Sequence, residues 1–173
     1  MKRTLAIGTV VLPCFLLFAW AVPELNFSGT WILDKDRSFS NPAGLEQTLT
    51  ITHNGDNLQL NAKLKTTQAG DQAIQESWTL DGQERDFVPE GAKPGTKGMR
   101  KGYWLLGNRG IVLVDERTSQ GPNGPVLQRT TRKLSLSPDG ATLTVDYFSD
   151  SPRGQSEAKR VFLRAGKDSA PGL

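Results

Sequence analysis

Hydrophobic and polar residues alternate along much of this chain, which is the period of a half-buried β-strand. Residues 58–65 alternate leucine or alanine with glutamine, asparagine and lysine. Residues 46–53 alternate leucine and isoleucine with threonine, and the turn Asn54-Gly55-Asp56-Asn57 separates the two segments. Asparagine and glycine tolerate the positive φ that tight hairpin turns require. The two segments therefore predict a hairpin with one buried face.

The same pattern of short strand and turn continues to the end of the chain, and no segment shows a helical period. Further strands are expected at 29–33, 73–80, 85–88, 99–106, 111–119, 126–136, 141–148 and 157–164. Hairpins that follow one another without long crossovers form an antiparallel meander. A long meander has two exposed edges unless it closes. We therefore expect an all-β fold, a single antiparallel up-and-down β-barrel of about 8–10 strands whose first strand pairs with its last. A two-sheet β-sandwich is the alternative.

The N-terminal segment has the pattern of an export signal. Met1-Lys2-Arg3 is basic, residues 4–20 carry no charge, and Ala19-Trp20-Ala21 gives the small-x-small pattern that signal peptidase recognises. We expect a signal peptide at 1–21, a barrel domain at 22–164 and a disordered tail at 165–173. The protein would then be periplasmic or secreted, without stable membrane insertion after cleavage. A retained N-terminal anchor is the alternative.

The single cysteine, Cys14, lies within the expected signal. Lipidation at Cys14 is a further alternative, although Pro13 stands where a lipobox has a small residue. Cleavage after Ala21 would leave no cysteine, so stability would depend on a hydrophobic core. Loss of Lys2 and Arg3 would lower the formal net charge of +3 by two. The remaining chain is nearly charge-balanced, which argues against a nucleic-acid partner.

Gly29-Thr30-Trp31 opens the first expected strand and resembles the Gly-x-Trp signature of lipocalins, a calycin family. The resemblance covers residues 26–164 and is closer to bacterial lipocalin-like domains of unassigned role than to transport lipocalins. It implies that the Trp31 indole closes one end of the barrel, with an arginine packed across it. Arg160 and Arg164 are the candidates for that structural role. The sequence matches the second motif of the lipocalin family only in part. The pattern of the helix that usually follows the lipocalin barrel is missing from it.

Alternation also predicts which side chains face the lumen. The ligand-binding candidates are Ile74, Glu76, Trp78, Arg132 and Tyr147, and the apolar inward candidates include Val161 and Leu163. A charge inside a barrel needs a partner. Glu76 paired with Arg132 or Arg117 could orient a polar ligand head. The alternative, which we favour from the sequence, is that these charges lie outside or pair at the rim.

The sequence contains no constellation that indicates catalysis. The single histidine, His53, ends a strand beside a turn and is expected to be exposed. With one histidine and no cysteine in the mature chain, we expect no metal site and no cofactor. No nucleophile motif appears, so we expect a protein that is not an enzyme, although a carboxylate mechanism through Glu76 stays open. The cations Lys93, Lys97, Arg100 and Lys101 are expected on a solvated loop, with an anion-gathering barrel mouth as the alternative.

Two functions fit this chain. The first is an exported lipocalin-like barrel that binds a small apolar or amphipathic molecule in its lumen. The second is a structural or protein-interaction barrel with a filled interior and no ligand. The volume of the lumen separates the two, because pockets for drug-sized ligands measure roughly 300–1,000 Å³. The sequence leaves the oligomeric state and the identity of any ligand open.

Overall fold

The computed structural model describes residues 25–89, 92, 95–122 and 124–166. The expected signal peptide, Cys14, Lys93 and most of the expected tail lie outside the described residues. Among the described residues, no helix is long and apolar enough to cross a membrane. The strands and the one short 3-10 helix are β1 (Gly29–Phe39), β2 (Glu46–Asn54), β3 (Asn57–Thr66), β4 (Gly70–Thr79), β5 (Arg85–Phe87), β6 (Lys97–Trp104), η1 (Leu106–Asn108), β7 (Ile111–Gly121), β8 (Gly124–Leu136), β9 (Thr142–Ser151) and β10 (Gly154–Arg164).

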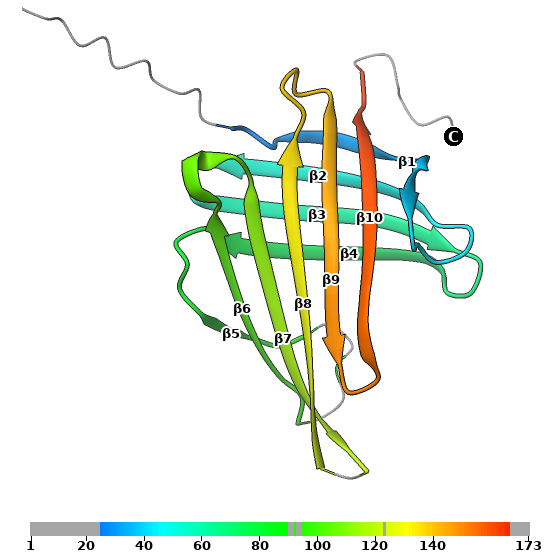
Figure 1. Ribbon diagram of the computed structural model, residues 1–173, viewed down its shortest axis with the longest axis vertical. Coiled ribbons are helices and arrows are strands. Elements are labelled where there is room, and N and C mark those ends of the chain that lie inside the picture. The colour runs from blue at the N-terminus through cyan, green and yellow to red at the C-terminus, as the bar shows by residue number, and fades with distance from the viewer. Residues whose placement is uncertain (1–24, 90–91, 93–94, 123, 167–173) are drawn as a thin grey trace, which may run out of the picture.

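All ten strands belong to one antiparallel sheet in the order β4-β3-β2-β1-β10-β9-β8-β7-β6-β5. The expected all-β antiparallel meander is confirmed, and so is the pairing of its first strand with its last. Trp31 is the register partner of Arg164, and Leu33 is the partner of Phe162. The sheet curls so that β1–β4 run across β6–β10 at a steep angle (Figure 1). The result is a half-barrel with its core between two crossed layers.

The barrel is broken between β4 and β5, which are the two ends of the sheet. Here the described chain has one isolated bridge, between Asp81 and Tyr103, and one further backbone bond, from Gly82 N to Gly102 O (2.9 Å). β5 is only three residues long and pairs with β6 alone. Side chains therefore have to hold the layers together along most of this gap.

Trp31 is fully buried at one end of the core. Its indole Nε1 donates to the Phe27 carbonyl (3.1 Å), and the Arg164 guanidinium carbon lies 4.2 Å from the centroid of its ring. Arg164 Nη1 also donates to the Ser28 carbonyl (2.7 Å). Of the two arginines named for this position, Arg164 occupies it, and Arg160 lies elsewhere.

The position of His53 corrects an expectation. The side chain is buried, with 7% of its surface exposed, and its ring lies 5.3 Å from Trp104 and 5.8 Å from Phe27. Its Nδ1 accepts a hydrogen bond from Phe27 N (3.4 Å). Because β2 runs to Asn54, His53 keeps the inward parity of its strand instead of joining the turn.

The parity expected for β10 was also wrong. The inner face of β10 carries Arg160 and the fully buried Phe162, whereas Leu163 is 44% exposed on the outer face. Val161 shares the outer parity of Leu163 but is covered there. Three consecutive apolar residues carry no period, so alternation could not assign the faces of this strand.

We predict that Gly29→Ala destabilises the fold by roughly 1–3 kcal/mol, because Gly29 has φ +144° and a Cβ there would lie 2.6 Å from Arg164 Nη1. Chemical denaturation measures the loss. Part of it should disappear in an Arg164→Ala background, where the clash is absent. Gly55→Ala is the control for backbone strain alone, since Gly55 has φ +57° and no atom near its Cβ position. Equal losses in both backgrounds would contradict the role of Arg164.

Candidate ligand-binding cavity

A cavity of about 150 Å³ lies between the crossed layers. Its apolar wall consists of Leu49, Leu60, Ala62, Leu64, Ile74, Leu134 and Val145, and its polar wall of Gln47, Glu76, Arg132, Tyr147 and Arg160. Four of the five lumen candidates from the sequence line it. The fifth, Trp78, lines a separate cavity of about 170 Å³ near the gap between β4 and β6.

The volume is small for a ligand-binding barrel. It lies below the roughly 300–1,000 Å³ of sites for drug-sized molecules. It is comparable to an engineered apolar cavity of about 150 Å³ that binds benzene. Most of the lumen is therefore filled by the protein's own side chains, and the space that remains suits a small molecule or one end of a longer one.

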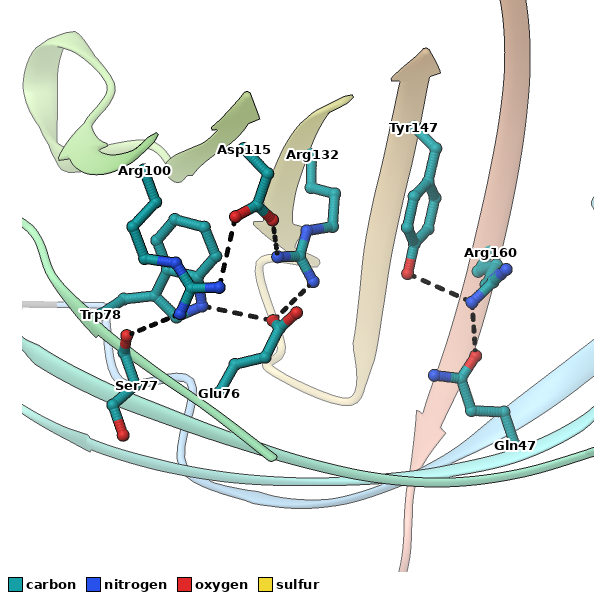
Figure 2. A network of polar contacts seen from close by, with 9 residues as sticks. All are labelled: Gln47, Glu76, Ser77, Trp78, Arg100, Asp115, Arg132, Tyr147 and Arg160. Atoms are coloured by element: carbon teal, nitrogen blue, oxygen red, sulfur yellow. Dashed lines mark hydrogen bonds and ion pairs between the residues drawn. The ribbon is translucent and has the colours of Figure 1, made fainter. Parts of the chain in front are cut away.

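A buried ionic network borders one side of the cavity (Figure 2). Arg132 on β8 contacts both Glu76 on β4 (2.8 Å) and Asp115 on β7 (3.0 Å). Arg100 on β6 contacts the second Asp115 oxygen at 3.3 Å, without hydrogen-bond geometry. The sequence named Glu76 and Arg132 as potential partners, and the structure places their pair inside the barrel, contrary to the alternative we favoured.

The network is formally neutral, which is the condition for tolerating charges in a nearly dry interior. Burial raises the pKa of Asp115, because desolvation outweighs the attraction of Arg132 and Arg100. Burial acts in the same sense on Glu76, but the Coulombic attraction and hydrogen bond of Arg132 outweigh it and lower the pKa. Trp78 Nε1 also donates to Glu76 Oε2 (3.3 Å). The pKa values of the two carboxylates in the network are therefore shifted in opposite directions.

Arg100 was expected on the solvated loop but points into the barrel. Its guanidinium carbon lies 4.4 Å from the Trp78 ring centroid and 3.8 Å from that of Phe87. Its Nη1 donates to the Ser77 carbonyl on β4 (3.4 Å). Arg100 thus joins β4, β5 and β6 across the gap where a backbone ladder is missing.

Sequence reasoning missed Arg100 because glycines hide the inward period of β6. Gly98 and Gly102 flank Arg100 on the same face, and neither adds an apolar side chain to the pattern. A Cβ at Gly98 would lie 2.6 Å from the Phe87 ring, so glycine makes room for the aromatic that covers Arg100. Two glycines spaced around an arginine were the signal available in the sequence.

A second polar cluster surrounds Arg160 on the other side of the cavity (Figure 2). Arg160 Nε donates to Asn41 Oδ1 (3.0 Å), and Nη1 donates to Gln47 Oε1 (2.9 Å) and to the Tyr147 hydroxyl (3.3 Å). The guanidinium also lies over the Tyr147 ring, 4.5 Å from its centroid. Among the described residues, no carboxylate forms an ion pair with Arg160.

The partners of Arg160 come from segments that the sequence did not mark as functional. Gln47 shares the inward parity of Leu49 and Ile51, which was the available signal for its position. Asn41 follows an irregular stretch of β1 between Asp34 and Phe39, and no sequence period locates it. Its placement depends on the register of β1 against β10, which is a tertiary property.

The described residues contain no group of three or more histidine, cysteine, aspartate or glutamate side chains that could hold a metal ion. What the arrangement offers is an apolar cavity with one neutralised and one unneutralised arginine on its walls. Such a surface can bind and orient a small molecule through burial and hydrogen bonds.

No protein-family model matches the chain, and no curated protein sequence matches it. A solved structure with a similar fold is the zebrafish ileal bile acid-binding protein complexed with cholic acid. The two chains are 14% identical, the match covers 80% of this chain and 98% of the other, and the TM-score is 0.48.

We predict that Glu76→Gln lowers the free energy of unfolding at pH 7 by about 3 kcal/mol, because it breaks a buried ion pair. The folded-state pKa of Glu76 lies below its ordinary value of 4.5. Its ionised form therefore stabilises the fold above that pH, and the contribution is lost as the pH falls through 4.5 towards the folded-state value. The difference between wild type and variant should shrink over that range in urea unfolding.

Glu46→Gln is the matched control, because Glu46 pairs with Lys35 at 3.0 Å but is 61% exposed. The control should cost less than about 1 kcal/mol at pH 7. A Glu76→Gln loss as small as that of Glu46→Gln, or one that does not change with pH, would contradict the buried role of the Glu76–Arg132 pair.

Proposed function

We propose that this half-barrel binds a small amphipathic molecule in the cavity between its two layers. The observation that carries the proposal is the composition of the cavity wall. Leu49, Leu60, Leu134 and Val145 are all buried and supply apolar contact. Polar groups gather on two sides of this surface and leave the rest of the wall apolar. An apolar surface with a few placed polar groups is the usual form of a small-molecule site.

Access to the cavity supports the same proposal. Ile74, which lines the cavity from the edge strand β4, keeps 38% of its surface exposed. β4 ends the sheet, so no further strand covers it on that side. A ligand can therefore enter beside Ile74 without breaking the backbone hydrogen bonds between two strands. A long apolar tail of the ligand can extend outward at the same place.

We infer binding and not catalysis from the state of Glu76, the carboxylate on the described cavity wall. Glu76 is held by Arg132 and Trp78, and its pKa is lowered, whereas an efficient general acid or base has a pKa near the working pH. The export pattern at residues 1–21 supports action outside the cytoplasm. The ligand would then come from the periplasm or the external medium.

The second candidate is a structural barrel without a ligand. The observation that favours it is the small cavity volume of about 150 Å³, since Trp78, Arg100 and Arg132 fill much of the interior. The two candidates differ in one measurable property. A binding protein responds to a small apolar probe at the cavity residues, and a filled barrel does not.

We predict that hexan-1-ol and hexanoate shift backbone amide resonances of cavity residues, including Leu60 and Val145, in nuclear magnetic resonance titrations. Ala62→Phe should abolish these shifts, because the Ala62 side chain faces the cavity and a phenyl ring would fill it. Ala73→Phe is the matched control, because Ala73 is exposed on the neighbouring strand with the opposite parity. It should bind as the wild type does.

Native mass spectrometry of the purified protein provides an independent measurement. A bound small molecule that is lost in Ala62→Phe but kept in Ala73→Phe would identify the natural ligand class. The absence of probe-induced shifts in the wild type would overturn the binding function and favour the filled barrel. Equal shifts in Ala62→Phe and Ala73→Phe would do the same.

A further inference from the structure

We propose that the ligand carries a singly charged oxyanion head, such as a carboxylate, and that Arg160, Gln47 and Tyr147 bind it. The inference rests on the proposed binding function and adds the chemical class of the ligand. It follows from the charges on the cavity wall and from the hydrogen-bonding groups that remain there without a partner.

The charges on the two sides of the cavity are not equivalent. Arg132 contacts two carboxylates, and Arg100 shares one of them, so the positive charges of that network are balanced. Arg160 instead contacts neutral oxygens only, from Asn41, Gln47 and Tyr147. Among the residues that line the cavity, Arg160 is therefore the one cation without a carboxylate partner. An anionic ligand head would supply the missing counter-charge.

The hydrogen-bonding groups around Arg160 lead to the same class of ligand. Arginine has donors and no acceptor, so the amide oxygen of Gln47 must be the atom that faces it. This leaves the Gln47 amide nitrogen directed away from Arg160. The Tyr147 hydroxyl likewise accepts from Arg160, so its own proton is available to another acceptor.

Three donors at the cavity therefore have no acceptor among the described residues: Arg160 Nη2, Gln47 Nε2 and the Tyr147 hydroxyl. The oxygen atoms of Gln47 and Tyr147 that face Arg160 already accept hydrogen bonds from the Arg160 guanidinium. Arg160 Nη2 and Gln47 Nε2 are not fully enclosed by protein atoms, so a ligand can reach both nitrogens. A cluster that offers donors and one positive charge is complementary to an oxygen that carries negative charge.

The geometry also limits the charge of the head to one unit. No second unpaired cation lies on the described cavity wall, because Arg132 is bound on both sides. A doubly charged phosphate would leave one charge uncompensated in a partly buried site, which is costly. A carboxylate joined to a small apolar body satisfies both walls of the cavity.

The test compares hexanoate with hexan-1-ol, which have the same apolar chain and differ in charge. We expect hexanoate to bind about tenfold or more tightly, because hydrogen bonds to charged groups are stronger than neutral ones. Arg160→Gln should bring the affinity for hexanoate down to that for hexan-1-ol, so that the ratio of the two dissociation constants approaches one. Amide shifts from titrations of the purified protein give both dissociation constants.

Arg129→Gln is the matched control, because Arg129 lies on β8, pairs with Glu116 at 3.1 Å and is half exposed outside the cavity. It removes the same charge and should keep the preference for hexanoate. Tyr147→Phe removes one donor while it keeps the ring, so it should weaken hexanoate binding several-fold and hexan-1-ol binding less. This variant tests the proposal if Arg160→Gln does not fold.

The outcomes separate the two proposals. Equal affinities for the two probes in the wild type, or a preference for hexanoate that persists in Arg160→Gln, would overturn the oxyanion head and leave the binding function intact. A preference lost equally in Arg129→Gln would also overturn it, because the effect would then be one of net charge. No binding of either probe would overturn both proposals.

Discussion

The inward position of three arginines is the constraint on which this structure depends. Arg100, Arg132 and Arg160 all project from the β6–β10 layer towards the β1–β4 layer. A guanidinium in a partly dry interior has to be matched by acceptors or by counter-charge. Two of the three meet carboxylates, and the third meets neutral oxygens. This difference gives the cavity two chemically distinct sides.

The same constraint explains how an incomplete barrel can hold its shape. A closed barrel satisfies its edges by backbone pairing, but here β4 and β5 end the sheet. Arg100 replaces part of the missing ladder with a contact to the Ser77 carbonyl and with a position between the Trp78 and Phe87 rings. The ionic network then continues from Arg100 through Asp115 and Arg132 to Glu76. Because Glu76 lies on β4, the network links β6, β7 and β8 to the edge strand. Side chains from five strands take part in this closure.

The sequence predicted local structure well where its period was unambiguous. The strict alternation in 58–65 located β3, and the turn at 54–57 located its hairpin. The expectation that a long meander pairs its two end strands predicted the β1–β10 pairing. The period failed where consecutive residues were alike, as in Val161-Phe162-Leu163, or where glycines left no side chain to count, as around Arg100. His53 was misplaced because a strand end and a turn cannot be distinguished at one residue. The site partners Asn41 and Arg160 are 119 residues apart, so only the tertiary register brings them together.

The free edge of β4 has a consequence for how the protein behaves among its own copies. β4 has no neighbouring strand on one side, and such an edge is a template on which another chain can add its backbone and start a growing sheet. On β4 the inner face carries a charged residue, Glu76, which is held by Arg132 and Trp78. Inward-pointing charges are one way in which natural proteins discourage such growth. The glutamate that completes the interior network is thus also a residue of the kind that discourages the addition of a further strand along the open side.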